Sequence, residues 1–374
     1  MSSETKMRFA LRTKIGVFVL LYCGGILFGL DLIYSNFFHR EDTGSARISS
    51  ARYSHGFAAN YQGPDSWGPL NYQLYTNSLG FKDGMVRKVA AKADAHRTLL
   101  IGDSFTEGMG MRFEDSFAGM LYQAGQVHAE KIEFLNAAVS SYSPVIYLQK
   151  IRLLLESGFR FDELIVFLDI SDIGEEATTY FCIDDEPRYR RHCDANAPLN
   201  LKEELKQWIR QNLVVLNRTR LLIKDGVRAW LGDDDWNAQV VLTLDSIPNM
   251  ESSWTFAGST TTLPPLGIEG GIARGLKNMK ALADLLAERR IPLTIVVYPW
   301  PLQLAHDDQD SRHIAIWREF CIRNCKSFIN LFPVFFAERD AHPDWYNRLF
   351  IHGDIHFSVE GHVLMFGELS KHLF

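Results

Sequence analysis

The sequence predicts an α/β domain built on a parallel sheet, and two patterns carry that prediction. Short, continuously apolar runs of strand length recur from about residue 96 onward. Between them lie segments whose apolar residues repeat at helical spacing. Strands that are apolar on both faces are typical of a parallel sheet covered by helices on both sides. We therefore expect a doubly wound α/β domain over residues 96–374.

Five segments are predicted as strands because they are apolar, short and in several cases β-branched. They are Thr98–Ile101, Ile132–Leu135, Leu164–Leu168, Leu293–Tyr298 and Phe328–Leu331. Helical spacing is present over residues 113–121, 145–155 and 271–289. A last helix is predicted after Ser358, which can cap it, because Val363, Phe366, Leu369 and Leu373 fall on one face.

The alternation of strands and helices is interrupted between about residues 174 and 270. This interval contains Leu199–Leu231, which has a helical pattern. Structureless loops of that length are rare inside compact domains. We therefore expect a helical insertion there.

The N-terminal region is predicted to anchor the chain in a membrane. Residues Ile15 to Tyr34 carry one charge, Asp31, and roughly twenty helical residues reach about 30 Å, the thickness of a bilayer core. A cleaved signal peptide is the alternative, but the stretch is long for one and no A-x-A-like site follows it. The predicted parts are a cytoplasmic N-terminus (1–14), a transmembrane helix (15–38) and a linker and lead-in (39–95) with at most short strands.

Cysteine positions suggest the compartment. Cys182 lies near Cys193 and Cys321 lies near Cys325, and both pairs are compatible with disulfides in an oxidising compartment. The alternative for the second pair is two buried thiols on one helix face. Together with a small excess of Lys and Arg before the apolar stretch, the cysteines favour a main body outside the cytoplasm, anchored in the inner membrane and on its periplasmic side if the source is a Gram-negative bacterium.

Charge and ligand patterns exclude several classes of function. The net charge is −6, with no basic stripe, so the chain lacks the electrostatic footprint of a nucleic-acid-binding protein. We expect neither cysteine pair to belong to a zinc-like ligand set. We expect no metal and no cofactor.

A candidate nucleophile, Ser104, follows the first predicted strand directly, in the segment Gly102-Asp103-Ser104-Phe105-Thr106-Glu107-Gly108. Ligands of open α/β sheets bind beyond the carboxyl ends of the strands, which is where this serine lies. A serine nucleophile needs a base within hydrogen-bonding reach and a third group that orients the base. Gly-Asp-Ser is also an ordinary turn sequence, which is the alternative interpretation.

A candidate base and its orienting group precede the last predicted helix. His356 lies on the loop that enters this helix, and Asp354 lies two residues before it. The carboxylate could hold the imidazole in the tautomer that presents its other nitrogen to Ser104. His352 is the fallback base, and we expect His352 and His362 otherwise to be loop or packing residues.

These two segments together resemble the SGNH or GDSL hydrolase superfamily, from about residue 70 to the C-terminus. The resemblance implies that Ser104, Asp354 and His356 form a catalytic triad. It also implies a flavodoxin-like three-layer α/β/α domain whose central, parallel, five-stranded sheet has the order 2-1-3-4-5.

The resemblance implies an oxyanion hole as well. Its donors would be the Ser104 N–H, the Ser141 N–H after the second strand, and the Ser171 side chain after the third. Ser141 stands where the family usually has glycine, and Ser171 replaces an asparagine in Asp169-Ile170-Ser171-Asp172. Because a serine hydroxyl is shorter and can rotate away, we expect weaker or differently assembled oxyanion stabilisation.

Two further segments, Tyr75–Phe81 and Tyr298–Pro301, resemble a subgroup of single-span bacterial envelope proteins, several of which are associated with O-acylation of polysaccharides. The expected function is that of a membrane-anchored serine esterase or O-acyltransferase acting on acetyl or similar esters of an envelope or exported polysaccharide. The expected partners are an acylated glycan and a membrane acyltransferase. Trp300 and Tyr142 could stack on a sugar, but packing of Trp300 in the turn is an equal alternative.

Two other functions stay open. The chain could be a lysophospholipase or thioesterase acting on lipid esters, which a membrane anchor would keep near its substrate. It could also be a non-catalytic, glycan-binding assembly subunit that retains the fold, because the usual asparagine and glycine are missing from the predicted oxyanion hole.

Overall fold

The computed structural model describes residues 3–35, 46–50, 52–183 and 251–374, together with isolated positions between 209 and 244. The chain forms two compact units, Met1–Gly44 with Asp194–Ala238 and Ser45–Cys193 with Gln239–Phe374. The second unit holds the sheet and the candidate site. The predicted helical stretch 199–231 and most of the predicted insertion lie outside the described residues.

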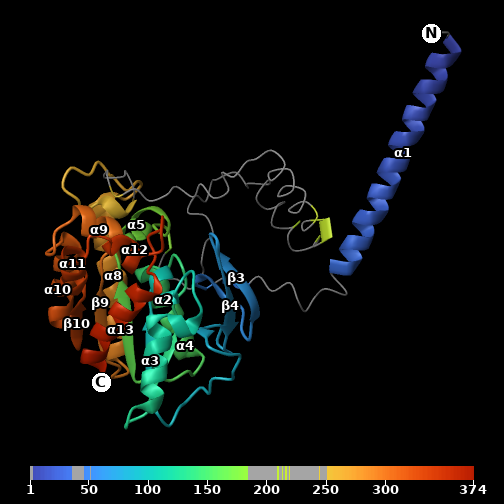
Figure 1. Ribbon diagram of the computed structural model, residues 1–374. Helices are drawn as coiled ribbons and strands as arrows, with labels where there is room; N and C mark the ends of the chain where they lie inside the picture. The colour runs from blue at the N-terminus through green and yellow to red at the C-terminus, as the bar shows by residue number, and fades with distance from the viewer. Residues whose placement is uncertain are drawn as a thin grey trace. The chain divides into compact units, whose positions relative to one another are not determined.

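The second unit is built on an eight-stranded sheet with the order β10-β9-β8-β6-β7-β5-β4-β3. Figure 1 labels β10 and β9 toward one side of this unit and β4 and β3 toward the other. Five strands are parallel, and each contains or overlaps a predicted strand. They are β6 (His96–Ile101), β7 (Ile132–Asn136), β8 (Glu163–Leu168), β9 (Leu293–Val297) and β10 (Ser327–Asn330). In chain order they are arranged 2-1-3-4-5, which confirms the flavodoxin-like order.

Helices cover the parallel strands in two groups. In one, α8 (Gly267–Ala287) packs against α4 (Pro144–Glu156) and α5 (Ser171–Thr178), and α10 (Arg312–Asn324) contacts α8 and β9. In the other, α3 (Phe117–Val127) packs against α13 (Val359–Leu373) and β7. The parallel strands between them are accordingly largely apolar, and all six residues of β8 are buried.

Shorter elements connect this framework. They are α2 (Ser104–Glu107), the 3₁₀ turns η2 (Phe113–Asp115) and η4 (Glu251–Ser253), α9 (Pro301–His306), α11 (Phe332–Ala341) and α12 (Trp345–Leu349). The predicted helix over 113–121 is divided, because Ser116 caps α3 by accepting a hydrogen bond from Gly119 N. Ser358 caps α13 in the predicted way, by accepting from Gly361 N.

The segment predicted as a linker and lead-in with at most short strands contains five short strands. β1 (Arg47–Ser50) and β2 (Ser54–Phe57) form a separate antiparallel pair. β3 (Gln62–Trp67), β4 (Leu70–Thr76) and β5 (Lys82–Asp83) extend the main sheet beyond β7 with antiparallel pairing. The physical reason is alternation: Tyr72, Leu74 and Thr76 of β4 are buried and their neighbours are not. We call residues 46–83 the N-terminal arm.

The segment Tyr75–Phe81, which resembles the envelope subgroup, forms the turn between β4 and β5. Asn77 Oδ1 accepts hydrogen bonds from Leu79 N at 3.0 Å and Phe81 N at 3.3 Å. Gly80 has a φ of 69°, and a Cβ there would lie 2.4 Å from the carbonyl oxygen of Phe57. Only glycine fits this turn, so the motif has a structural role in the arm.

The first unit contains the helix α1 (Ser3–Ile33). Within the described parts of the chain, no helix combines the length and the apolar character needed to cross a membrane. The transmembrane helix predicted over 15–38 therefore has no support from the structure.

Cys321 and Cys325 form a disulfide at the C-terminal end of α10. The alternative of two buried thiols is wrong for this pair. Cys182 is also disulfide-bonded, but Cys193, its predicted partner, lies outside the described residues. Cys23 is a free, exposed thiol.

Candidate active site

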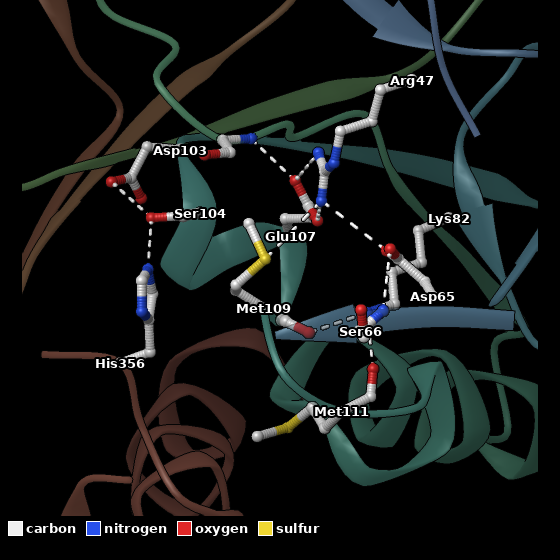
Figure 2. Close-up of polar contacts among 12 residues, drawn as sticks. Arg47, Asp65, Ser66, Lys82, Asp103, Ser104, Glu107, Met109, Met111 and His356 are labelled. Carbon is white, nitrogen blue, oxygen red and sulfur yellow. Dashed lines mark hydrogen bonds and ion pairs between the residues drawn. The ribbon is translucent and has the colours of Figure 1, made fainter. Parts of the chain in front are cut away.

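The structure brings Ser104, His356 and Asp354 together in one hydrogen-bonded series. His356 Nε2 lies 2.8 Å from Ser104 Oγ (Figure 2), and His356 Nδ1 lies 2.6 Å from Asp354 Oδ1. Ser104 is 8% exposed and His356 is 5% exposed. A serine hydroxyl, a base and an orienting carboxylate in this order can activate the serine for attack on an acyl carbon.

The backbone around Ser104 is fixed by two glycines. Ser104 is the first residue of α2, directly after β6, and Asp103 caps that helix by accepting from Phe105 N at 3.0 Å. A Cβ at Gly102 would lie 2.3 Å from Thr106 Oγ1, and Gly108 ends the helix with a φ of 77°. The strand end and the short helix therefore present the serine at the carboxyl edge of the sheet.

The loop before α13 holds Asp354, the orienting carboxylate, and His356, the candidate base. Asp354 Oδ1 also accepts a hydrogen bond from His356 N at 2.9 Å, so one oxygen binds the ring and the backbone of the same residue. Burial alone would raise the pKa of Asp354, but the hydrogen bonds and charge of His356 and the Trp67 N–H hold it below its ordinary value. Asp354 therefore stays ionised and fixes the imidazole tautomer.

Trp67, on β3 of the N-terminal arm, is a part of the site that the sequence did not reveal. Its Nε1–H donates to Asp354 Oδ2 at 2.7 Å. Its ring also meets the His356 ring edge to face, with 5.1 Å between centroids. No sequence signal could have identified it, because a single tryptophan in a surface hairpin lies 287 residues from its partner.

Trp67→Phe tests the contribution of this N–H, because it removes the donor and keeps an aromatic ring. A hydrogen bond to a charged group contributes about 1.5–3 kcal/mol, so we expect kcat on a model ester to fall about tenfold to a hundredfold. Trp317→Phe is the matched control: Trp317 is buried in α10, and its Nε1 has no partner among the described residues. An equal loss in both variants would show that the effect is on packing.

Two of the three predicted oxyanion donors are available. The N–H groups of Ser104 and Ser141 donate to no residue in the described parts of the chain. Ser141 has a φ of 59°, in the left-handed region, which explains why glycine is the usual residue there. Ser171 differs, because its hydroxyl donates to Asp169 Oδ1 at 2.7 Å and its N–H donates to the same oxygen at 2.8 Å. The role of Ser171 as a third donor stays a prediction, because its hydroxyl would first have to break its hydrogen bond to Asp169 and rotate toward the oxyanion.

Ser171→Ala measures whether that hydroxyl serves the reaction. Removing a working oxyanion donor typically costs about a hundredfold or more in kcat. Because the Ser171 hydroxyl already donates its hydrogen bond to Asp169, we expect Ser171→Ala to lower kcat by less than about fivefold, well below the loss for a working donor. Steady-state kinetics on a model ester checks this. A loss of two orders of magnitude would restore Ser171 to the oxyanion hole.

A cluster of buried carboxyl groups lies behind Ser104. The Tyr298 hydroxyl lies 3.0 Å from Asp103 Oδ1 and 3.2 Å from Asp169 Oδ2, and Asp172 Oδ2 accepts from Asp169 N at 2.8 Å. Burial, followed by the charge of Asp169, raises the pKa of both Asp103 and Asp172 well above the ordinary value. Asp103 and Asp172 therefore keep their protons to a higher pH than exposed aspartates do.

The predicted sugar-stacking residues are buried. Trp300 is 7% exposed, and its Nε1–H donates to Asp169 Oδ2 at 2.8 Å. Tyr142 is fully buried, and its hydroxyl donates to His55 O at 2.6 Å. The structure favours the packing interpretation for both.

The other two histidines near the base have separate places. His362 is buried and accepts a hydrogen bond from Phe117 N through Nδ1 at 3.2 Å. Burial, with the charges of Lys82 and His356, lowers the pKa of His362 to about 3. His352 is exposed and contacts Asn347. His356, and not the fallback His352, therefore meets Ser104.

Glu107, on α2, joins the nucleophile segment to the N-terminal arm. Its carboxylate pairs with both terminal nitrogens of Arg47, at 3.0 and 2.5 Å (Figure 2). It also accepts from Ser140 N at 2.7 Å. Burial would raise the pKa of Glu107, but the Arg47 charge and hydrogen bonds lower it. Lys82 Nζ donates to Gly108 O and to the carbonyl oxygen of Met111, both at 2.7 Å. Arg47 and Lys82 of the N-terminal arm thus bind α2, which begins at Ser104, and the residues that follow it.

Comparisons with known proteins give only distant structural similarity. No protein-family model matches the chain, and no curated protein is similar to it in sequence. Among solved structures, the chain is similar to the psychrotrophic esterase EstA from Pseudoalteromonas sp., with 11% identity, a TM-score of 0.38 and coverage of 74% of this chain and 95% of that one. It is also similar to the acetyl xylan esterase AlAXEase, with 12% identity, a TM-score of 0.40 and coverage of 74% and 100%.

A third similar structure is AlinE4, an esterase of the SGNH-hydrolase family, with 16% identity, a TM-score of 0.35 and coverage of 76% of this chain and 99% of that one. These TM-scores are too low to decide fold or function. The strand order and the geometry around Ser104 carry the functional proposal.

Proposed function

We propose that this chain is a serine esterase of the SGNH type. The observation that carries the proposal is the hydrogen-bonded series from Ser104 Oγ through His356 to Asp354 at the carboxyl edge of a parallel sheet. Two backbone N–H groups, from Ser104 and Ser141, supply the donors that an acyl-transfer site requires beside its nucleophile.

The proposed reaction has two halves. Ser104 Oγ attacks the ester carbon while His356 Nε2 takes the hydroxyl proton, and Asp354 stabilises the resulting imidazolium. The N–H groups of Ser104 and Ser141 bind the oxyanion. His356 returns the proton to the leaving alcohol, which leaves an acyl-serine. Water, or a sugar hydroxyl in a transferase, then attacks this acyl-serine with His356 again as the base.

The particular substrate that we propose is an acetyl or similar acyl ester of an envelope or exported polysaccharide. The support comes from the sequence resemblance of Tyr75–Phe81 and Tyr298–Pro301 to envelope proteins associated with O-acylation. A membrane acyltransferase would be the partner if the enzyme transfers acyl groups.

For location, we propose a single-pass protein of the inner membrane whose catalytic domain lies outside the cytoplasm. The Cys321–Cys325 disulfide supports an oxidising compartment. The membrane attachment rests on the apolar sequence of residues 15–34 alone. Protease treatment of spheroplasts that carry the full chain tests this: digestion of the catalytic domain is expected, and protection would contradict it.

Labelling with a fluorophosphonate tests the proposed chemistry. The full chain should become labelled at Ser104, with mass spectrometry locating the adduct, and should release acetate from an acetylated glycan. Release of fatty acid from lysophospholipid without release of acetate would favour a lipid esterase. Folded protein that takes up no label would favour the non-catalytic, glycan-binding alternative.

A further inference from the structure

We infer that His55, on β2 of the N-terminal arm, is a positioning residue for the oxyanion hole: it holds the Ser140–Ser141 peptide so that the Ser141 N–H faces the reacting oxygen. This inference rests on the proposed function and deepens it. Along the chain, His55 is 85 positions from Ser140 and outside the sequence segments that predicted the site. In space, it meets the site through the backbone of Ser140.

The contact itself is short and well defined. His55 Nε2 lies 2.6 Å from the carbonyl oxygen of Ser140. In a trans peptide the C=O of one residue and the N–H of the next lie in one plane and point in opposite directions. A donor that fixes the Ser140 carbonyl therefore fixes the Ser141 N–H, on the opposite side of the peptide.

Neighbouring backbone groups are held in the same way. Ser140 N donates to Glu107 at 2.7 Å, and the Tyr180 hydroxyl donates to Ser141 O at 2.6 Å. Side chains thus bind the groups on both sides of the peptide, while the Ser141 N–H has no acceptor among the described residues. This is the arrangement expected of a donor that is kept open for a ligand.

The peptide needs such support because Ser141 is not glycine. Its φ of 59° lies in the left-handed region, which is unfavourable for a residue with a side chain. Rotation of the peptide would relieve that strain and turn the Ser140 carbonyl toward the oxyanion. The hydrogen bond from His55 opposes this rotation.

His55 is held in the state that the role requires. Burial, together with the charges of Lys150 and Arg47, lowers its pKa, so the ring is neutral at neutral pH. With the proton on Nε2, Nδ1 can accept from Ser54 Oγ, 2.9 Å away. Tyr142 packs edge to face on the ring, with 5.2 Å between centroids. The ring is therefore oriented from three sides.

Two substitutions separate positioning from packing. His55→Phe removes the N–H and keeps a ring, whereas His55→Gln keeps an N–H donor at a similar reach. On a model ester we expect His55→Phe to lower kcat about tenfold to a hundredfold with KM nearly unchanged. His55→Gln should recover kcat to within about fivefold of the wild type. His128→Phe, at a half-buried histidine that ends α3, is the control and should change neither, because the new ring can keep the contact with Phe374.

Crystal structures of the wild type and His55→Phe give a readout that does not depend on turnover. We expect the Ser140 carbonyl to be rotated in the variant. An unrotated peptide, or an equal loss of kcat in His55→Gln and His55→Phe, would overturn the inference while leaving the esterase proposal intact. Failure of the folded wild type to label at Ser104 would instead overturn the proposed function, and with it the role of Ser141 as an oxyanion donor.

Discussion

A Ser104→Ala variant is expected to lose at least about 10⁴-fold in kcat on any ester that the wild type cleaves, because loss of a serine nucleophile removes the covalent route entirely. The remaining rate would come only from substrate binding and from stabilisation of the oxyanion by the backbone N–H groups. The Ser104 hydroxyl contacts His356 and, at 3.4 Å, Asp103, and it supports no other element. The midpoint of thermal unfolding should therefore change little.

The matched control is Ser370→Ala, on α13, where the hydroxyl donates only to Phe366 O of the same helix. Both variants should fold, and only Ser104→Ala should lose fluorophosphonate labelling and ester hydrolysis. Wild-type turnover in Ser104→Ala would falsify the nucleophile assignment, whatever the labelling result.

Asp354→Asn is expected to lower kcat by about 10⁴-fold, the loss seen when an amide replaces the carboxylate of a serine triad. The structure gives a specific reason. Trp67 donates to Oδ2, whereas His356 N and Nδ1 both meet Oδ1. If the asparagine keeps its oxygen as the acceptor for Trp67, its NH₂ faces the N–H and Nδ1 of His356. Both of these groups donate to Oδ1 in the wild type, and an NH₂ cannot accept from them. The imidazole would then place its proton on Nε2 and could not accept from Ser104.

Steady-state kinetics and labelling rates measure this effect. The control is Asp340→Asn, at an exposed aspartate of α11 that pairs with Arg339, and it should leave kcat unchanged. If Asp354→Asn lost less than about tenfold, Asp354 would be a loop-stabilising residue without a role in orienting the base.

The parallel sheet and the hydrogen-bonded series of Ser104, His356 and Asp354 could be predicted because their signals are local. β8 and β9 are buried throughout, and their residues are apolar except for Glu163 and Thr294. Ser104 follows a strand directly, and His356 precedes a capped helix. Each of these signals lies within about ten residues, and the chirality of α/β connections brings the segments to one edge of the sheet.

The N-terminal arm could not be predicted in the same way. β3 carries Pro64 and alternates between exposed and partly buried residues, as edge strands do. Its pairing with β4, and that of β5 with β7, depends on the finished sheet. Trp67 and His55 act through contacts with residues 287 and 85 positions away. No periodicity in the sequence encodes such contacts.

The partners of Ser171 and Trp300 were missed for a related reason. Both side chains have a donor that could point toward a ligand, and both donate to Asp169 instead. A buried donor takes a hydrogen-bond acceptor within its reach, and no pattern in the sequence indicates that Asp169 would be that acceptor.

The distance along the chain between Ser104 and His356 has a consequence for synthesis. The two residues are 252 positions apart, and chains grow at about 5–20 residues per second. The nucleophile is therefore made roughly ten seconds to a minute before its base. During that time the nascent chain carries an unactivated serine, so esterase activity should begin only after translation has passed His356.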